Sequence, residues 1–513
     1  MAKRVEKFAY LIYETGEKMA YCRYINKMLK NDADCRPYLP LDPFNEDLYK
    51  TTKNGIVLCK LVNASFPGAI DERAVHKNAI IFYPSQMVDN VLLALTAAQC
   101  NGCPVADFTV DDLTNNTSLS RCVILEVVWQ IIKCGFFRRI NLSEHPELCK
   151  LKLLEENVND LKCIPPEDLL MRYVNFHLKF EGVDAHLNFI GVELADCVIY
   201  AHLLPAIAPV TIRGRLIPPD QVLLDDNIAN RAKAVLQNLR EMEADMFLCL
   251  NDFTDSKVHL ESRAKLHLAT LAYLFCHFPG ELVNPRRNNE APTNEPISEL
   301  SSRNFVNSCA VTPFATHVCD NLRDGLITRQ LFEILRSGST TGLKFITEFD
   351  RSRKLAQFIY NNTNIVRLVQ GYPLPLPHMD SEKLSKTDEA CCLSLLLEIL
   401  RAYITSDHYD EVELLRWTNE QLYRAGKSTE LRSFNDRVIA EENLFAIVLN
   451  NLTNNMADSR NLTSKKLNNA AYSISVAHKA GYPVFTRPEH FVSCDAAFVA
   501  LAFATLRWFA PRH

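Results

Sequence analysis

Hydrophobic residues recur at intervals of three and four positions along most of this 513-residue chain. That spacing places them on one face of a helix, so it predicts amphipathic helices. The alternation of apolar and polar positions that is typical of strands is almost absent. The sequence therefore predicts an all-α protein.

One short pattern recurs on four of the predicted helices: an aromatic residue, any residue, and then asparagine. The copies are Tyr24-Ile25-Asn26, Tyr173-Val174-Asn175, Phe305-Val306-Asn307 and Trp417-Thr418-Asn419. They lie a domain's length apart, much farther than the roughly 20–50 residues of solenoid repeats. One module is therefore used four times. The asparagine could bind a partner, but we favour a structural role in which it satisfies buried backbone groups.

Two further apolar stretches with helical spacing follow each copy of the pattern. The first stretch covers 47–63, 192–207, 321–335 and 441–452 in the four modules. Asn54-Gly55 and Asp324-Gly325 supply a turn or helix-start signal within two of them. The second stretch covers 118–137, 263–278, 389–404 and 496–509. Because it is apolar almost all round, we expect it to form the central helix of each module.

Domain boundaries follow from changes in composition. Residues 281–298 are rich in proline and asparagine and contain paired arginines, which is typical of a linker. The predicted domains are 1–140, 165–280, 298–406 and 408–513, with a linker at 281–297 between the two halves. The architecture is thus two tandem pairs.

Charge and cysteine content narrow the class of protein. With 56 basic and 61 acidic residues the net charge is −5, which argues against nucleic acid as the main partner. The 17 cysteines are scattered through apolar stretches, as expected for reduced thiols in a cytoplasmic protein. The N-terminus lacks the apolar core of a signal peptide, and the longest apolar run is too short to span a bilayer. We expect a cytoplasmic protein with no membrane insertion.

The candidate chemical motifs do not support an active site. Gly426-Lys427-Ser428 resembles the end of a phosphate-binding loop, but Gln421 stands where that loop needs glycine, so a helix C-cap is favoured. Cys100 and Cys103 have zinc-like spacing without a second pair of ligands. We therefore predict no catalysis, no metal and no cofactor.

Longer stretches of the chain resemble the fimbrin (plastin) family. They are NGIVLCKLVNASFPGAIDERAVHK (54–77), LEVVWQIIKCGFF (125–137), EDLLMRYVNFHL (167–178) and RAGKSTELRSFNDRVIA (424–440), with RNFVN and LRDGLI in the diverged third module. The similarity runs in the same order from about Glu17 to about Ala510. It implies four calponin-homology domains that form two tandem actin-binding domains. Such a chain, as a monomer, would hold two actin filaments in a tight bundle.

The calcium-binding EF-hand pair that usually opens this family is not expected here, since the chain starts almost directly at the first module. The one candidate calcium loop begins at Asp320, but Leu322 and Leu331 replace ligands at its third and twelfth positions. Either the chain is the core fragment of a longer protein or its bundling is calcium-independent, and we expect calcium-independent bundling. The alternative is a scaffold with one working actin-binding pair, whose second pair binds another partner, such as a microtubule or a signalling protein.

The resemblance implies three contact elements in each pair: the first and last helices of the leading module and the first helix of the next. In the first pair these are 18–30, 119–138 and 166–180; in the second, 298–309, 388–404 and 410–424. The expected actin-binding residues are Lys18, Arg23, Lys27, Arg121, Glu126, Gln130, Lys133, Phe136, Arg138, Arg139, Glu167, Arg172, Lys179, Glu389, Glu398 and Arg401. We expect Phe136 and Phe137 to be exposed beside the basic cluster Lys133, Arg138 and Arg139. The second pair is less basic, so we expect the two pairs to differ in affinity.

Overall fold

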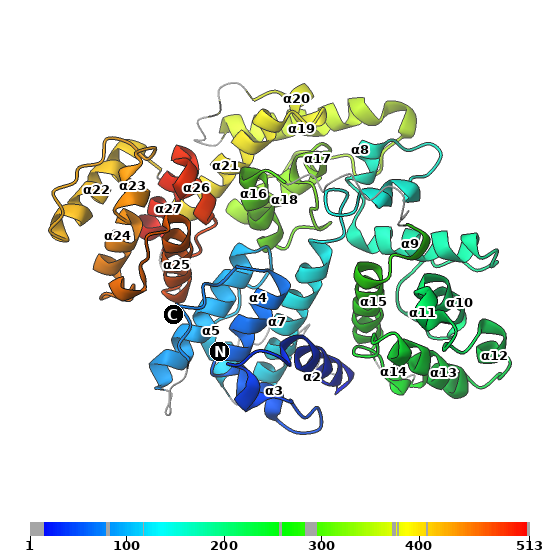
Figure 1. Cartoon of the computed structure of the whole chain (residues 1–513). Coiled ribbons are helices and arrows are strands. Elements are labelled where there is room, and N and C mark those ends of the chain that lie inside the picture. Colours follow the sequence, from blue (N-terminus) through cyan, green and yellow to red (C-terminus); the bar gives the residue numbers. More distant parts are fainter. Residues whose placement is uncertain are drawn as a thin grey trace. The chain divides into compact units, whose positions relative to one another are not determined.

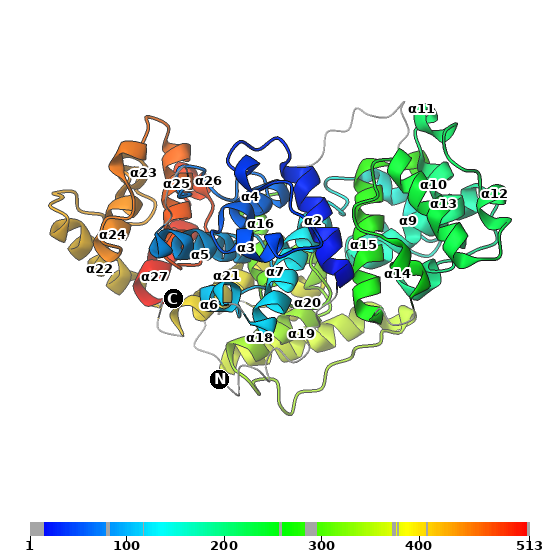
Figure 2. The same ribbon diagram turned by 90° about the horizontal axis from the view of Figure 1, so that it is seen from below.

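The computed structural model describes residues 15–77, 83–115, 117–255, 259–282, 295–371, 376, 379–406 and 409–509. Within them every regular element is a helix, so the predicted all-α class is confirmed (Figures 1 and 2). None of the helices in this described part has the length and apolar character needed to cross a bilayer. Parts of the predicted domains (1–14, 78–82, 116, 256–258, 372–375, 377–378, 408 and 510–513) and of the predicted linker (283–294) lie outside the described residues.

The predicted helices form, but the first apolar stretch of each module forms its main helix only in its later part, and 47–63 is divided between two helices. The helices that carry the aromatic-x-asparagine pattern are α2 (Thr15–Leu29), α9 (Pro166–Phe180), α16 (Ile297–Ser308) and α22 (Glu411–Arg424). The next apolar stretches form α4 (Ile56–Ser65), α10 (Val198–Ile207), α18 (Leu326–Leu335) and α24 (Leu444–Leu452). The closing helices are α7 (Ser118–Phe137), α15 (Leu260–His277), α21 (Glu389–Thr405) and α27 (Ala496–Trp508). As expected, most side chains of the closing helices are buried.

Each module also has a further long helix that the sequence analysis missed. These helices are α5 (Pro84–Cys100), α13 (Ile228–Glu241), α19 (Lys354–Gly371) and α25 (Lys466–Lys479). The short helices are α3 (Asp47–Thr52), α6 (Val110–Thr114), α8 (Val158–Leu161), α11 (Val210–Arg213), α12 (Pro219–Leu223), α14 (Leu250–Thr254), α17 (Val318–Asn321), α20 (Ser381–Ser385), α23 (Val438–Glu441) and α26 (Pro488–Ser493). Short 3-10 turns lie at Arg36–Tyr38, Pro146–Leu151, Val192–Leu194, Gly280–Leu282, Arg351–Arg353 and Ser459–Asn461.

The repeated asparagine has the same structural role in all four modules. Asn26 accepts a hydrogen bond from the backbone N–H of Leu41 at 2.7 Å and donates to its carbonyl at 2.9 Å. Asn175 does the same with Leu187, Asn307 with Ala315, and Asn419 with Leu431. Each side-chain amide thereby pairs both backbone groups of one residue in the loop after the helix. The structural interpretation of the pattern is confirmed.

A second asparagine, on the long helix that was missed, pairs with the backbone in a similar way. Asn90, Asn238, Asn361 and Asn469 each accept from and donate to the backbone of one loop residue. Gly55 begins α4 in a left-handed conformation (φ 73°), and a Cβ there would lie 2.5 Å from Cβ of Asn90. Glycine at this position therefore allows both the backbone turn and the close approach of α5.

The helices pack into two compact units, which we describe separately. The first comprises Met1–Thr52 and Asp112–Asn294, and the second comprises Lys53–Asp111 and Glu295–His513. In the second unit, α5 packs against α25 and α16 (Figures 1 and 2). Arg73, in the loop before α5, also donates to the carbonyls of Asn461 and Asn468 at 2.5 and 2.6 Å. Residues 53–111 of the first module therefore pack with the third and fourth modules. These units group residues by how they pack and not by sequence repeat, so they do not test the predicted domain boundaries, which stay predictions.

Candidate functional site

The expected contact helices of the first pair all belong to the first unit, and their ends are stabilised locally. Helix α2 has an acidic residue in its first turn and Lys27 in its last, which suits the helix dipole. Helix α7 starts after Thr117, whose side chain accepts a hydrogen bond from the N–H of Ser120 at 3.1 Å. Helix α9 starts with Pro166, two acidic residues follow, and Lys179 lies in its last turn. The three helices are thus fixed scaffolds for the side chains they carry.

One group of expected residues gathers around the ring of Tyr49, on α3. The ammonium of Lys18 lies 5.5 Å from the ring centroid, and the guanidinium carbon of Arg121 lies 5.6 Å from it. Arg121 also pairs with Glu46 at 2.9 Å, and its side chain is 48% exposed. Lys18 is only 5% exposed. Of the two cations, Arg121 is therefore the one that can reach a partner.

A second group faces the second module. Arg23 donates to the carbonyl of Leu248 at 3.4 Å. Lys27 donates to the carbonyl of Glu243, and its ammonium lies 5.2 Å from the ring centroid of Tyr273. Both cations on this part of α2 are thus occupied by residues of the neighbouring module.

Glu126 and Gln130, on α7, belong to a polar network with the second module. Lys265, on α15, donates to Glu126 at 3.0 Å, and Gln130 donates to the same carboxylate at 2.6 Å. Lys265 also lies 3.9 Å from a carboxylate oxygen of Glu17, whose side chain is 4% exposed. Burial raises the pKa of Glu17. Although burial opposes it, the Glu126 and Glu17 carboxylates raise the pKa of Lys265, which keeps the ammonium charged.

The expectation that Phe136 and Phe137 are exposed is wrong. Phe136 is 5% exposed and Phe137 is 1% exposed. The Phe136 ring packs edge-on against Phe247 and Tyr273 of the second module, with centroid distances of 6.2 and 6.4 Å. The reason is that α7 is a central helix whose side chains are buried up to its last residue. The neighbouring basic side chains, Lys133, Arg138 and Arg139, are half-buried.

On α9 the three expected residues differ in their surroundings. Arg172 makes a bidentate pair with Glu156 at 2.6 and 2.8 Å, and the hydrogen bond from Arg172 lowers the pKa of Glu156. Burial raises the pKa of Glu167. Lys179 is exposed near the C-terminal end of the helix. Arg172 is therefore paired with the segment that precedes the second module, whereas Lys179 is available to a partner.

In the second unit, the expected residues on α21 form a different environment. Glu398 is buried at 7% exposure and pairs with Arg401, whose guanidinium lies 4.6 Å from the ring centroid of Tyr409. Glu389 is exposed at the start of the helix. Burial, followed by the charges of Glu295 and Glu389, raises the pKa of Glu299 on α16 to about 7. The expected residues of the second pair thus combine a buried ion pair with an exposed carboxylate.

Other candidate sites fit structural roles. Gly426 has a left-handed conformation (φ 74°), and the N–H of Lys427 after it donates back to Leu422 at 3.0 Å, which is a helix C-cap. Leu322 and Leu331, at ligand positions of the candidate calcium loop, are each 1% exposed within an apolar core.

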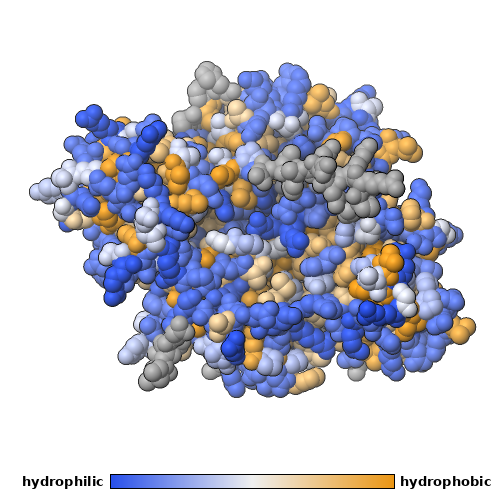
Figure 3. Space-filling model, in the orientation of Figure 1, coloured by the Kyte–Doolittle hydropathy of each residue, from blue (hydrophilic) through white to orange (hydrophobic). Residues whose placement is uncertain are grey.

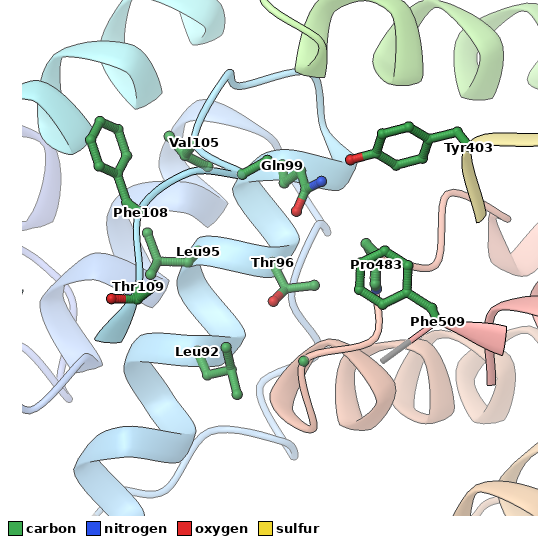
Figure 4. Close-up of a pocket in the computed structure, with 12 residues that line it drawn as sticks. Leu92, Leu95, Thr96, Gln99, Val105, Phe108, Thr109, Tyr403, Pro483 and Phe509 are labelled. Carbon is green, nitrogen blue, oxygen red and sulfur yellow. The ribbon is translucent and has the colours of Figure 1, made fainter. Parts of the chain in front are cut away.

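Helix α5 and the loop after α25 line a cavity of about 40 Å³, with Tyr403 and Phe509 among the residues that line it (Figure 4). That volume is far below the roughly 300–1,000 Å³ of typical ligand pockets.

The sequence analysis missed the contacts that the expected residues of α2 and α7 make with other parts of the first unit. Tyr49, Phe247, Tyr273 and Lys265 lie on elements that it did not connect with α2 and α7. One signal was present: Lys265 is a single ammonium within the apolar closing stretch of the second module. Across the face seen in Figure 3, residues are mainly hydrophilic with hydrophobic ones scattered among them, so surface hydropathy does not mark a binding site on this face.

Comparisons with known proteins agree with this architecture. The family model for the calponin homology (CH) domain matches residues 15–136. Plastin-1 of Bos taurus is 32% identical to this chain, and plastin-3 of Homo sapiens is 31% identical; each match covers 96% of this chain and 80% of the relative. Among solved structures, the actin-crosslinking core of Schizosaccharomyces pombe fimbrin matches with a TM-score of 0.77. That match covers 96% of this chain and 99% of the fimbrin chain. At 23% identity it supports the fold alone.

Proposed function

The chain belongs to the plastin family, and we propose that it binds actin filaments and cross-links them into bundles through two tandem pairs of calponin-homology domains. The observation that carries the proposal is the similarity to plastins over 96% of the chain, together with an all-helical fold like that of a fimbrin core. Two sites on one chain are sufficient for bundling, because the second attachment is intramolecular once the first has formed. The proposal requires no cofactor and no oligomer, and it places the protein in the actin cytoskeleton of the cytoplasm.

Within the first pair, we propose that the exposed cations of the expected surface make the first contact with actin. Arg121 on α7 and Lys179 on α9 combine exposure with positions on expected contact helices. Actin presents an acidic surface, so exposed cations steer its approach. In the second pair the expected surface has the exposed carboxylate of Glu389, and we propose that this pair binds more weakly. The scaffold alternative is not favoured, because the similarity to plastins includes both pairs.

Charge reversal tests this surface in the full chain. Lys179→Glu and Arg121→Glu should each weaken high-speed co-sedimentation with actin filaments, and more so at low salt. Lys233→Glu is a matched control, because Lys233 is exposed on α13 of the same module and that helix is outside the expected surface. If Lys233→Glu weakens binding as much as Lys179→Glu, the effect is one of net charge and the proposed surface is wrong.

A further inference from the structure

The third module contains a basic segment, residues 323–367, in a chain whose net charge is −5. Eight basic and four acidic residues occur in this segment, although acidic residues outnumber basic ones in the whole chain. The segment comprises α18, the long loop after it and most of α19. Its exposed cations are Arg336, Lys344, Arg351, Arg353 and Arg367. Positive charge is therefore concentrated on one part of the module.

Aromatic rings hold the other three cations of the segment. Arg323 and Lys354 share the ring of Phe358, with the guanidinium carbon 5.4 Å and the ammonium 5.9 Å from its centroid. The guanidinium carbon of Arg329 lies 5.1 Å from the ring centroid of Phe345. A ring attracts a cation without carrying a formal negative charge, so these contacts order the cations and keep the segment positive.

The loop after α18 lies along α19. Asn361 accepts a hydrogen bond from the N–H of Ile346 at 2.8 Å, and Asn364 donates to the carbonyl of Lys344 at 2.7 Å. The amide oxygen of Asn364 also accepts from Arg367 at 3.0 Å. Lys344 of the loop and Arg367 of the helix therefore lie beside the same asparagine, and both residues are exposed.

Helix α19 adds exposed aromatic and apolar surface to these cations. Its 18 residues, Lys354–Gly371, include neither aspartate nor glutamate. Arg353, directly before the helix, is followed at intervals of two helical turns by Tyr360 and Arg367, and all three are exposed. Tyr360 is 46% exposed, and Leu355 in the first turn is 47% exposed. Large uncharged side chains thus stand among the cations.

Carboxylates of the segment fix the loop at both of its ends. Glu333 accepts hydrogen bonds from the N–H groups of Gly338 at 2.8 Å and Thr340 at 2.9 Å. Asp350 accepts from the N–H of Ser352 at 2.9 Å, in the turn before α19. The loop that carries Lys344 is therefore held in a defined position on the module.

We propose that this part of the third module docks the protein on a membrane that contains anionic lipids. The five exposed cations, together with Tyr360 and Leu355, form what we call the basic surface. Its cations contact the lipid phosphates, and its two uncharged side chains lie among the headgroups. The contact is peripheral, since none of the helices in the described part of the chain has the length and apolar character to cross a bilayer.

The composition of the basic surface favours a membrane over other anionic partners. Clusters of roughly four to eight lysines and arginines are typical of surfaces that bind phosphatidylserine and phosphoinositides. Arginine suits phosphate because its guanidinium offers several donors in one plane. Nucleic acid would use the same cations but would leave Leu355 in water. The basic surface also lies outside the helices expected to contact actin, so this inference adds a second partner and does not depend on actin binding.

Vesicle co-sedimentation of the full chain tests the proposal. The vesicles contain phosphatidylcholine alone, or phosphatidylcholine with phosphatidylserine and a phosphoinositide. The double variant Lys344→Gln, Arg353→Gln removes two cations of the basic surface. Its matched control is Arg432→Gln, Lys465→Gln, which removes two exposed cations from the fourth module and leaves the basic surface intact. All four positions are exposed, so both variants should fold like the wild type.

The wild type should sediment with the anionic vesicles and not with phosphatidylcholine alone, and less of it should sediment as the salt concentration rises. The variant in the basic surface should bind anionic vesicles about tenfold more weakly or worse, and the control should bind almost as the wild type does. Equal losses in the two variants would reveal an effect of net charge and overturn the proposal. A wild type that binds no anionic vesicles would also overturn it. If the variant in the basic surface then binds actin filaments more weakly than the control, this surface contacts the filament instead.

Discussion

Replacement of Asn307 by alanine tests the structural role of the repeated asparagine. In the third module its amide donates to the carbonyl of Ala315 at 2.9 Å and accepts from the same residue's N–H at 2.8 Å. Asn307 is 3% exposed and Ala315 is fully buried, so water does not replace the lost partners. A buried backbone group left unsatisfied costs about 1–3 kcal/mol, and Asn307→Ala leaves two such groups. We therefore expect the variant to lose about 2–6 kcal/mol of stability in the third module.

Hydrogen exchange followed by mass spectrometry measures this loss directly. The peptide that contains Ala315 should exchange faster in Asn307→Ala by a factor corresponding to that free energy. Asn251→Ala is the control. Asn251 is exposed on α14, so its replacement should leave the exchange rate of the peptide that contains Ala315 unchanged. An Asn307→Ala variant whose exchange at Ala315 equals that of the wild type would refute the reasoning, since the hydrogen bonds would then contribute nothing.

Two further predictions concern a glycine and the buried histidines. Gly55→Ala should lower the thermal unfolding temperature more than Gly68→Ala. Both positions have positive φ (73° and 77°), but only at Gly55 would an added Cβ lie within 2.6 Å of Asn90. Equal losses of stability would show that the close approach to Asn90 is unimportant. Burial lowers the pKa of His177 and His478 to about 4 and that of His267 to about 3. Unfolding then takes up protons below the ordinary histidine pKa of about 6.5, so stability is complete above that value and is lost as pH falls from 6.5 toward 4. Thermal unfolding between pH 7 and 5 measures this, and a midpoint that stays constant would contradict it.

Much of the fold was predictable because its signals are local. Apolar spacing predicted the twelve helices of the three recurring types, and the asparagine pattern predicted both their repetition and its structural cause. The fourth long helix of each module was missed. In α5, for example, the apolar run starts only at Val91, well after the helix begins at Pro84. The asparagines on these helices were missed together with the helices.

The candidate site was less predictable, because exposure depends on contacts between modules. The polar faces of α2 and α7 identified Arg23, Lys27 and Glu126 as charged positions, but the residues that occupy them come from elements more than a hundred positions later in the chain. Phe136 shows the same limit: its position at the end of an apolar helix looked like an exposed edge. The ring is instead enclosed by Phe247 and Tyr273.

The central claim is that one chain holds two actin filaments, and sedimentation at two speeds tests it most directly. The full chain is mixed with actin filaments, with calcium or with a calcium chelator, and spun at high speed to detect binding and at low speed to detect bundles. The account predicts that the protein pellets at high speed and that actin also pellets at low speed, equally with and without calcium. High-speed binding without low-speed actin would contradict the claim, because it would mean that only one of the two pairs binds a filament.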